Sequence, residues 1–210
     1  MLPFLFTAGI SYLLGSIPFG YILVRTFRGQ DIRTSGSGNI GATNVARSSP
    51  ALGMLTLVLD AGKGFLAVYL AIFILNRTSL GYYDARLYSM MSLATLSAIV
   101  GHMFPVWLNF HGGKGVAAAF GGFLLFAPRA ILGAVIVFLL IILITRYVSL
   151  ASIIATAIFP LFAWLFYRRY FSPGGIVIVS IASFLVILRH HQNIGRLFAG
   201  TEPRFQLRRG

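Results

Sequence analysis

Residues 116–145 read VAAAFGGFLLFAPRAILGAVIVFLLIILIT, and the single charge in this stretch is Arg129. A transmembrane helix needs about 20 apolar residues, so the stretch is long enough to enter the membrane twice. Pro128 interrupts it, because proline lacks the backbone N–H that a helix interior uses and suits the first position of a new helix. The stretch therefore predicts two helices, over about residues 116–126 and 129–145.

Similar windows of low charge recur on both sides of this stretch. They cover residues 2–24, 52–75, 87–110, 148–167 and 174–188. Since 58% of the 210 residues are hydrophobic and 10% are charged, the composition excludes a soluble globular protein. The sequence predicts an all-α integral membrane protein with about seven transmembrane helices, forming a single membrane-embedded domain over residues 1–210.

Basic residues collect at one end of the predicted helices. That end carries Arg25, Arg28, Arg33, Arg47, Lys114, Arg146, Arg189, Arg196, Arg204, Arg208 and Arg209. The other end carries Arg77, Arg86, Arg129, Arg168 and Arg169. Because loops rich in Lys and Arg stay in the cytoplasm, we expect the N-terminus outside and the C-terminus in the cytoplasm.

The formal net charge of +13 limits the partners. It suits attraction to anionic membrane lipid, above all for residues 204–209. The basic residues are scattered among loops and form neither a basic helix nor an aromatic-rich sheet, so nucleic acid is not expected as a partner. The chain has no cysteine, which excludes disulfides, cysteine metal sites and a thioester acyl-enzyme.

The first motif is residues 35–47, SGSGNIGATNVAR, which has no acidic group. Gly36, Gly38 and Gly41 permit backbone turns that aim successive N–H groups at an anion. Further neutral donors are Ser35, Ser37, Thr43 and Asn44, and Arg47 supplies a forked cation. The motif predicts a phosphate-binding loop, and the alternative is a flexible polar connector.

The second motif is residues 101–122, GHMFPVWLNFHGGKGVAAAFGG. Its Gly112-Gly113-Lys114-Gly115 turn leads into a predicted helix. A lysine between glycines at a helix start combines a mobile charge with free N–H groups and a positive dipole end, which suits phosphate. The alternative for Lys114 is a basic anchor at the membrane surface, and His102 can simply hydrogen-bond a neighbouring helix.

The third motif is residues 189–205, RHHQNIGRLFAGTEPRF. If the last helix continues through it, Arg189, Asn193 and Arg196 fall on one face, with His190 beside Asn193. Such a face suits a doubly charged ligand, and Glu202 is placed to orient an arginine. The alternative is a basic cluster that attracts lipid headgroups.

Two further charges, Asp60 and Lys63, lie at positions i and i+3 of the second predicted helix. A neutralised pair is a cheap way to bury two charges, so we expect the pair to orient the helix beneath the first motif. The three motifs supply donors and cations, but no paired carboxylates, no Ser-His-Asp set and no metal cluster. Transfer from a preactivated phosphate compound needs nothing more.

These motifs, in this order, resemble those of the bacterial acyl-phosphate:glycerol-3-phosphate acyltransferase (PlsY) family, and LDAGKG at residues 59–64 is similar to the family's pattern. The resemblance implies transfer of a fatty acyl group from acyl phosphate to the first hydroxyl of glycerol 3-phosphate. The products are 1-acylglycerol 3-phosphate (lysophosphatidate) and phosphate, early in phospholipid synthesis. It also implies no cofactor, and a bacterial cytoplasmic (inner) membrane location with the active site facing the cytoplasm.

On this resemblance, the expected site residues fall in all three motifs. Those expected to bind substrate are Ser35, Gly36, Gly38, Asn39, Thr43, Asn44, Arg47, Gly112, Gly113, Arg189, Arg196 and Glu202. Those expected to act in catalysis are Ser37, Lys114, His190 and Asn193. No metal site is expected.

Within this set, the first motif is expected to bind acyl phosphate, with Arg47 and Lys114 neutralising charge. Arg189, Asn193 and Arg196 would hold glycerol 3-phosphate. The base stays open, because either His190 or the donor phosphate can accept the hydroxyl proton.

Two positions depart from the family's pattern, which commonly has lysine at His111 and threonine at Ala118. The main alternative function is a small transporter or channel for phosphate or an organic anion. A lipid-binding scaffold is a third, and it would not depend on Ser37 or Lys114.

Overall fold

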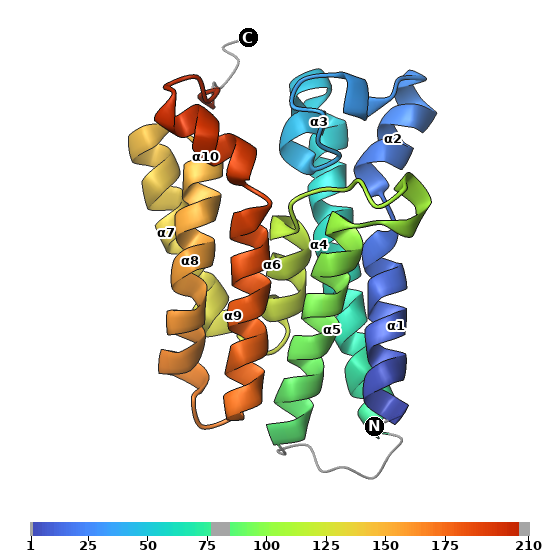
Figure 1. Ribbon diagram of the computed structural model, residues 1–210, viewed down its shortest axis with the longest axis vertical. Helices are drawn as coiled ribbons and strands as arrows, with labels where there is room; N and C mark the ends of the chain where they lie inside the picture. The colour runs from blue at the N-terminus through green and yellow to red at the C-terminus, as the bar shows by residue number, and fades with distance from the viewer. Residues whose placement is uncertain (1, 77–84, 206–210) are drawn as a thin grey trace.

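The computed structural model describes residues 2–76 and 85–205, which form a bundle of helices without a β-strand (Figure 1). The helices are α1 (Leu2–Ser16), α2 (Phe19–Arg28), α3 (Ala42–Ser48), α4 (Pro50–Asn76), α5 (Ala85–Met103), α6 (Val116–Leu124), α7 (Pro128–Thr145), α8 (Val148–Tyr167), α9 (Pro173–Leu188) and α10 (His191–Phe198). Two short 3-10 helices, η1 (Ile32–Thr34) and η2 (Val106–Leu108), lie in loops. The predicted all-α class is confirmed for these residues. Three arginines used to predict the orientation, Arg77, Arg208 and Arg209, lie outside them.

Five stretches of the described chain are long and apolar enough to cross a membrane. They are Leu2–Arg28, Pro50–Leu75, Arg86–Leu108, Pro128–Thr145 and Val148–Tyr167. The helices α9 and α10, which meet at a bend of 53°, make a sixth if they are counted together. The 9 residues of α6 span only about 14 Å, roughly half of the hydrocarbon core. A membrane protein is therefore supported, whereas about seven membrane-spanning helices are not confirmed.

The prolines decide two helix boundaries. Pro128 begins α7, as the sequence predicted. The prediction of one helix over residues 2–24 is wrong in one respect, because α1 ends at Ser16 and α2 begins at Phe19. Pro18 lies in this break, where it offers no N–H to the helix and restricts the residue before it.

The short helix α6 is held tightly against α4. The Cα of Gly64 lies against the carbonyl of Ala118, and that of Gly121 lies against the carbonyl of Ala61, so a Cβ at either glycine would collide with backbone. Close glycine contacts of this kind let helices pack within a membrane without large side chains. They fix the position of α6 and of the turn that precedes it.

The loops that contain the three motifs lie at one end of the bundle, the upper end in Figure 1. We call this the polar end, and it comprises residues 29–49, 104–115 and 189–205. The second motif enters between α5 and α6 and lies deeper in the bundle than α3 (Figure 1). The start of α1 lies at the opposite end.

Candidate functional site

The side chain of Asn44 shapes the first motif. Its Nδ2 donates to the carbonyls of Ile32 (3.3 Å), Ser35 (3.0 Å) and Asn39 (2.9 Å). Its Oδ1 accepts from the N–H of Ser37 (2.9 Å). Asn44 was predicted to offer a donor to the substrate, but its amide is buried and occupied by the loop itself. In the structure, the side chain of Asn44 supports the loop.

Most of the polar residues in the rest of the first motif face outward. Ser35, Gly36, Ser37, Gly38 and Thr43 are exposed, and Asn39 is half-buried. Gly36 and Gly38 have φ of 59° and 69°, in the left-handed region that favours glycine. The guanidinium of Arg47 reaches back from α3, because a Cβ placed on Gly36 would lie 3.6 Å from its Nη1.

The second motif is held by backbone contacts on both sides. The N–H groups of Gly112 and Gly113 donate to the carbonyls of Met103 (3.1 Å) and His102 (3.0 Å). From α9, the guanidinium of Arg189 donates to the carbonyls of Gly113 (Nε, 3.3 Å) and Gly112 (Nη2, 3.1 Å). The turn that carries Lys114 is therefore clamped between the end of α5 and the end of α9.

The third motif does not continue the last helix, so the predicted single face is wrong. The chain bends by 53° between α9 and α10, and Arg189 lies in this break, with its side chain directed to the second motif. Asn193 and Arg196 lie on α10 and share a different partner, Glu202. The guanidinium of Arg189 is engaged in supporting the turn, in addition to the substrate contact predicted for it.

Glu202 organises the far side of the site. It accepts from Asn193 Nδ2 (2.7 Å) and from Arg196 Nε (2.7 Å), so the expectation that it orients an arginine is confirmed. Burial raises the pKa of Glu202, but the hydrogen bonds from Asn193 and Arg196 lower it, and the net direction is down. Glu202 is therefore ionised, and Asn193 Oδ1 remains buried without a hydrogen-bond partner among the described residues.

Lys114 of the second motif interacts electrostatically with charges of the first and third motifs. Burial lowers the pKa of its ammonium to about 8. The charge of Glu202 opposes this change, whereas the charges of Arg196, Arg47 and Arg189 reinforce it. Since these groups come from the first and third motifs, residues far apart in the sequence share one electrostatic site, as the sequence predicted.

His190 lies in the break between α9 and α10 and is buried. Its Nδ1 lies 2.8 Å from the carbonyl of Val186. A carbonyl only accepts, so we assign the proton of the neutral ring to Nδ1 and the lone pair to Nε2. Burial and the charge of Lys114 lower the pKa of His190 to about 4, which keeps the ring neutral at physiological pH.

Sequence reasoning missed one structural feature near the site. The pair of Asp60 and Lys63 was predicted, whereas its contact with His102 from α5 was not. In the described part of the chain, no group of three or more His, Asp or Glu side chains is placed to hold a metal ion.

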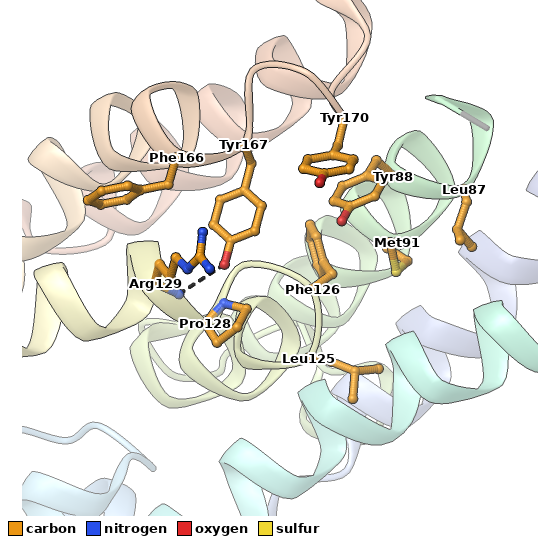
Figure 2. Close-up of a pocket in the computed structure, with 10 residues that line it drawn as sticks. All are labelled: Leu87, Tyr88, Met91, Leu125, Phe126, Pro128, Arg129, Phe166, Tyr167 and Tyr170. Carbon is orange, nitrogen blue, oxygen red and sulfur yellow. Dashed lines mark hydrogen bonds between the residues drawn. The ribbon is translucent and has the colours of Figure 1, made fainter. Parts of the chain in front are cut away.

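A separate groove (Figure 2) is lined by residues near the start of α5, the start of α7 and the end of α8, at the end of the bundle opposite the polar end (Figure 1). Its volume is about 480 Å³, and half of its lining residues are aromatic, including Tyr88, Phe126, Tyr167 and Tyr170. The N–H of Arg129 donates to the hydroxyl of Tyr167 (3.0 Å). None of the predicted site residues lines this groove.

Comparison with known proteins gives one consistent result. A family described as glycerol-3-phosphate acyltransferase matches residues 5–200. A protein of Syntrophotalea carbinolica named glycerol-3-phosphate acyltransferase is 47% identical over 200 residues, covering 93% of this chain and 94% of that protein.

Two crystal structures of PlsY, an integral membrane glycerol 3-phosphate acyltransferase, have a similar fold. The glycerol 3-phosphate form has a TM-score of 0.84 and 39% identity, covering 97% of this chain and 96% of that chain. The lysophosphatidic acid form has a TM-score of 0.81 and 38% identity, covering 97% and 95%.

Proposed function

Since the chain belongs to the glycerol-3-phosphate acyltransferase family, we propose that it transfers a fatty acyl group from acyl phosphate to the 1-hydroxyl of glycerol 3-phosphate. The products are lysophosphatidate and inorganic phosphate, in an early step of phospholipid synthesis. Glycerol 3-phosphate and lysophosphatidic acid name the two forms of the similar PlsY structures, which supports this acceptor and this product.

One observation supports the proposal best: Lys114 of the second motif interacts electrostatically with cations of the first and third motifs. Arg47, Arg189 and Arg196 all act on its ammonium, and Glu202 is the one acidic group that does so. This excess of positive charge favours the binding of an anionic partner. Two substrates that each carry a phosphate would supply the missing negative charge.

The chemistry needs no group beyond those in the site and the two substrates. The hydroxyl oxygen of glycerol 3-phosphate attacks the acyl carbon of the mixed anhydride, and the bond from that carbon to the phosphate oxygen breaks. Negative charge grows on the leaving phosphate, where Lys114, Arg47 and the N–H groups of the first motif stabilise it. Since acyl phosphate is already activated, no cofactor takes part.

The hydroxyl proton has two possible acceptors, and we divide the roles between them. His190 has a pKa of about 4, so it is a weaker base than a free imidazole. We assign it the role of accepting a hydrogen bond at Nε2, which orients the hydroxyl. The proton then passes to the leaving phosphate, so the products balance without an external acid.

The proposed membrane arrangement follows the distribution of charge. The chain forms a single membrane-embedded domain over residues 1–210, with about seven transmembrane helices if α6 is counted as a short pass. The N-terminus lies outside, and the polar end faces the cytoplasm of a bacterial inner membrane. The donor's acyl chain lies among membrane lipid while its phosphate reaches the first motif.

Phosphate release tests the proposal directly. Purified protein in lipid or detergent receives palmitoyl phosphate, with and without glycerol 3-phosphate, and without ATP. Release that requires glycerol 3-phosphate and produces lysophosphatidate is the expected result. Palmitoyl coenzyme A, supplied in place of palmitoyl phosphate, is expected to give no product.

Two results would contradict the proposal. Product from palmitoyl coenzyme A but not from palmitoyl phosphate would overturn the donor. Binding of phosphate compounds without any turnover would favour the transporter or channel alternative.

A further inference from the structure

Three ionisable side chains lie buried beneath the second motif. Asp60 and Lys63 belong to α4 and His102 to α5, and their exposed fractions are 2%, 4% and 3%. Lys63 Nζ lies 2.8 Å from Asp60 Oδ1, and His102 Nδ1 lies 3.5 Å from the same oxygen. Charges inside membrane helices are costly, so three such groups in contact need an explanation. A neutral pair accounts for two of them but not for His102.

Lys63 also makes a contact outside the cluster. Its Nζ donates to the carbonyl of Ile17 (2.7 Å), next to the break between α1 and α2. The ammonium is thus fixed by a carboxylate on its own helix and by a carbonyl from another part of the chain. Lys63 in turn holds the carboxylate of Asp60 in place beside the imidazole of His102.

His102 connects this cluster to the proposed site. Its carbonyl accepts from the N–H of Gly113 (3.0 Å). Its imidazole fills the space beside the Cα of Gly113, so a Cβ there would collide with Nε2. Gly113 therefore contacts both the backbone and the side chain of His102, and Lys114 is the next residue.

The turn itself has little stiffness of its own. Glycine flanks Lys114 on both sides, and a lysine side chain carries its charge on a flexible four-carbon stem. The position of the ammonium therefore depends on what holds the backbone of the turn. Arg189 holds it from α9, and His102 holds it from α5.

We propose that Asp60, Lys63 and His102 are positioning residues for acyl transfer. The ion pair fixes the imidazole of His102, and His102 fixes the backbone of Gly113, so that Lys114 meets the phosphate of the donor. The inference rests on the proposed role of Lys114. A displacement of about 1 Å at a reacting group can cost about 100-fold in rate, so a remote support of this kind is enough to control turnover.

The first experiment removes both charges of the pair. The variant Asp60→Asn/Lys63→Met avoids leaving one buried charge unpaired, which would destabilise the fold. We expect kcat per folded molecule to fall by about tenfold or more. The matched control is Thr56→Val on the same helix, because Thr56 is equally buried and its hydroxyl donates only to Leu52 of its own helix. The control should keep the kcat of the unchanged protein.

The pH profile separates positioning from mere stability. Lys114 is faced by Arg47, Arg189, Arg196, Glu202 and His190. If the turn moves among these groups, the alkaline limb of kcat/KM shifts in the double variant. A purely structural role would lower the melting temperature but leave kcat per folded molecule and the alkaline limb unchanged, and that result would overturn the inference.

The second experiment uses the contact between Gly113 and His102. Gly113→Ala should lower kcat by about tenfold or more, because its methyl group displaces the imidazole. In a His102→Ala background the space is free, so the same change should cost less than about twofold. Gly112→Ala is the matched control, since a Cβ there would meet the carbonyl of His102 and the ring of Pro105, which His102→Ala does not remove. Additive effects of Gly113→Ala and His102→Ala would overturn the inference.

The unchanged protein and Lys114→Ala are measured beside these variants. If the unchanged protein makes no lysophosphatidate, the proposed function and this inference fail together. If Lys114→Ala loses activity while Asp60→Asn/Lys63→Met and Gly113→Ala/His102→Ala behave like the unchanged protein, the proposed function stands and this inference alone fails.

Discussion

At the scale of single residues, Lys114 is a partly buried cation in a strongly positive part of the site. The charges of three arginines and one glutamate act on its ammonium, and it lies on a turn whose backbone is held from two helices. The cost of crowding these cations is offset when substrate phosphates arrive. The ammonium should therefore stabilise the transition state, in which phosphate charge is present, more than it stabilises the protein without substrate.

Lys114→Ala should lower kcat/KM by at least about tenfold. Loss of a charge-assisted hydrogen bond costs about 1.5 to 3 kcal/mol, and about 1.4 kcal/mol corresponds to a factor of ten. Steady-state kinetics with palmitoyl phosphate and glycerol 3-phosphate measure the change. Near-normal activity in a folded variant would remove Lys114 from the site.

The pH dependence of kcat/KM should report the same ammonium. The group acts as a cation, and its pKa in the free protein is about 8. It is protonated below this value, so kcat/KM should fall as the pH rises through about 8. Lys114→Arg keeps its charge over this range and should move the alkaline limb to higher pH. An alkaline limb at the same pH in the arginine variant would assign it to another group.

His190→Gln tests the division of roles in proton transfer. Glutamine retains a hydrogen-bond acceptor but has no titratable group in this range. If His190 only orients the hydroxyl, the variant should keep measurable turnover with an unchanged acid limb in its pH–rate profile. Disappearance of that limb would identify His190 as the base.

At the scale of elements, the first motif depends on an internal support. Asn44→Asp is nearly isosteric, but it removes the Nδ2 donor from three backbone carbonyls and places a carboxylate beside them. We expect KM for acyl phosphate to rise by about tenfold or more, since the N–H groups of the loop lose their arrangement. Ser48→Ala on the same helix is the control, because its hydroxyl bonds to Val45 of that helix. Equal KM values for the two variants would contradict the supporting role.

The helix boundaries show which features of the fold can be predicted from local sequence. The start of α7 at Pro128 was predicted because proline acts locally. The bend between α9 and α10 was not, and Arg189 there bonds to Gly113, which is 76 positions away in the chain. In the site, the grouping of the three motifs was predicted from residue types. The hydrogen bonds of the Asn44 side chain and the contact of His102 with Gly113 depend on tertiary packing. Hydrophobic periodicity in the sequence does not predict such contacts.

At the scale of the whole molecule, all three motifs lie at one end of the bundle (Figure 1), and this arrangement makes the orientation testable. The chain has no cysteine, so one introduced cysteine is a unique site for a maleimide. Gln30 lies at the polar end, Arg169 lies in the turn that follows α8 at the other end, and both are exposed.

In intact right-side-out spheroplasts, a membrane-impermeant maleimide should label Arg169→Cys and should label Gln30→Cys only after lysis. The basic excess at the polar end predicts this pattern, and both variants must retain turnover so that labelling reports the active fold. The opposite pattern would place the polar end outside the cell. Charged substrates made in the cytoplasm would then have to cross the membrane before reaching Lys114, which would separate the site from any cytoplasmic source of acyl phosphate.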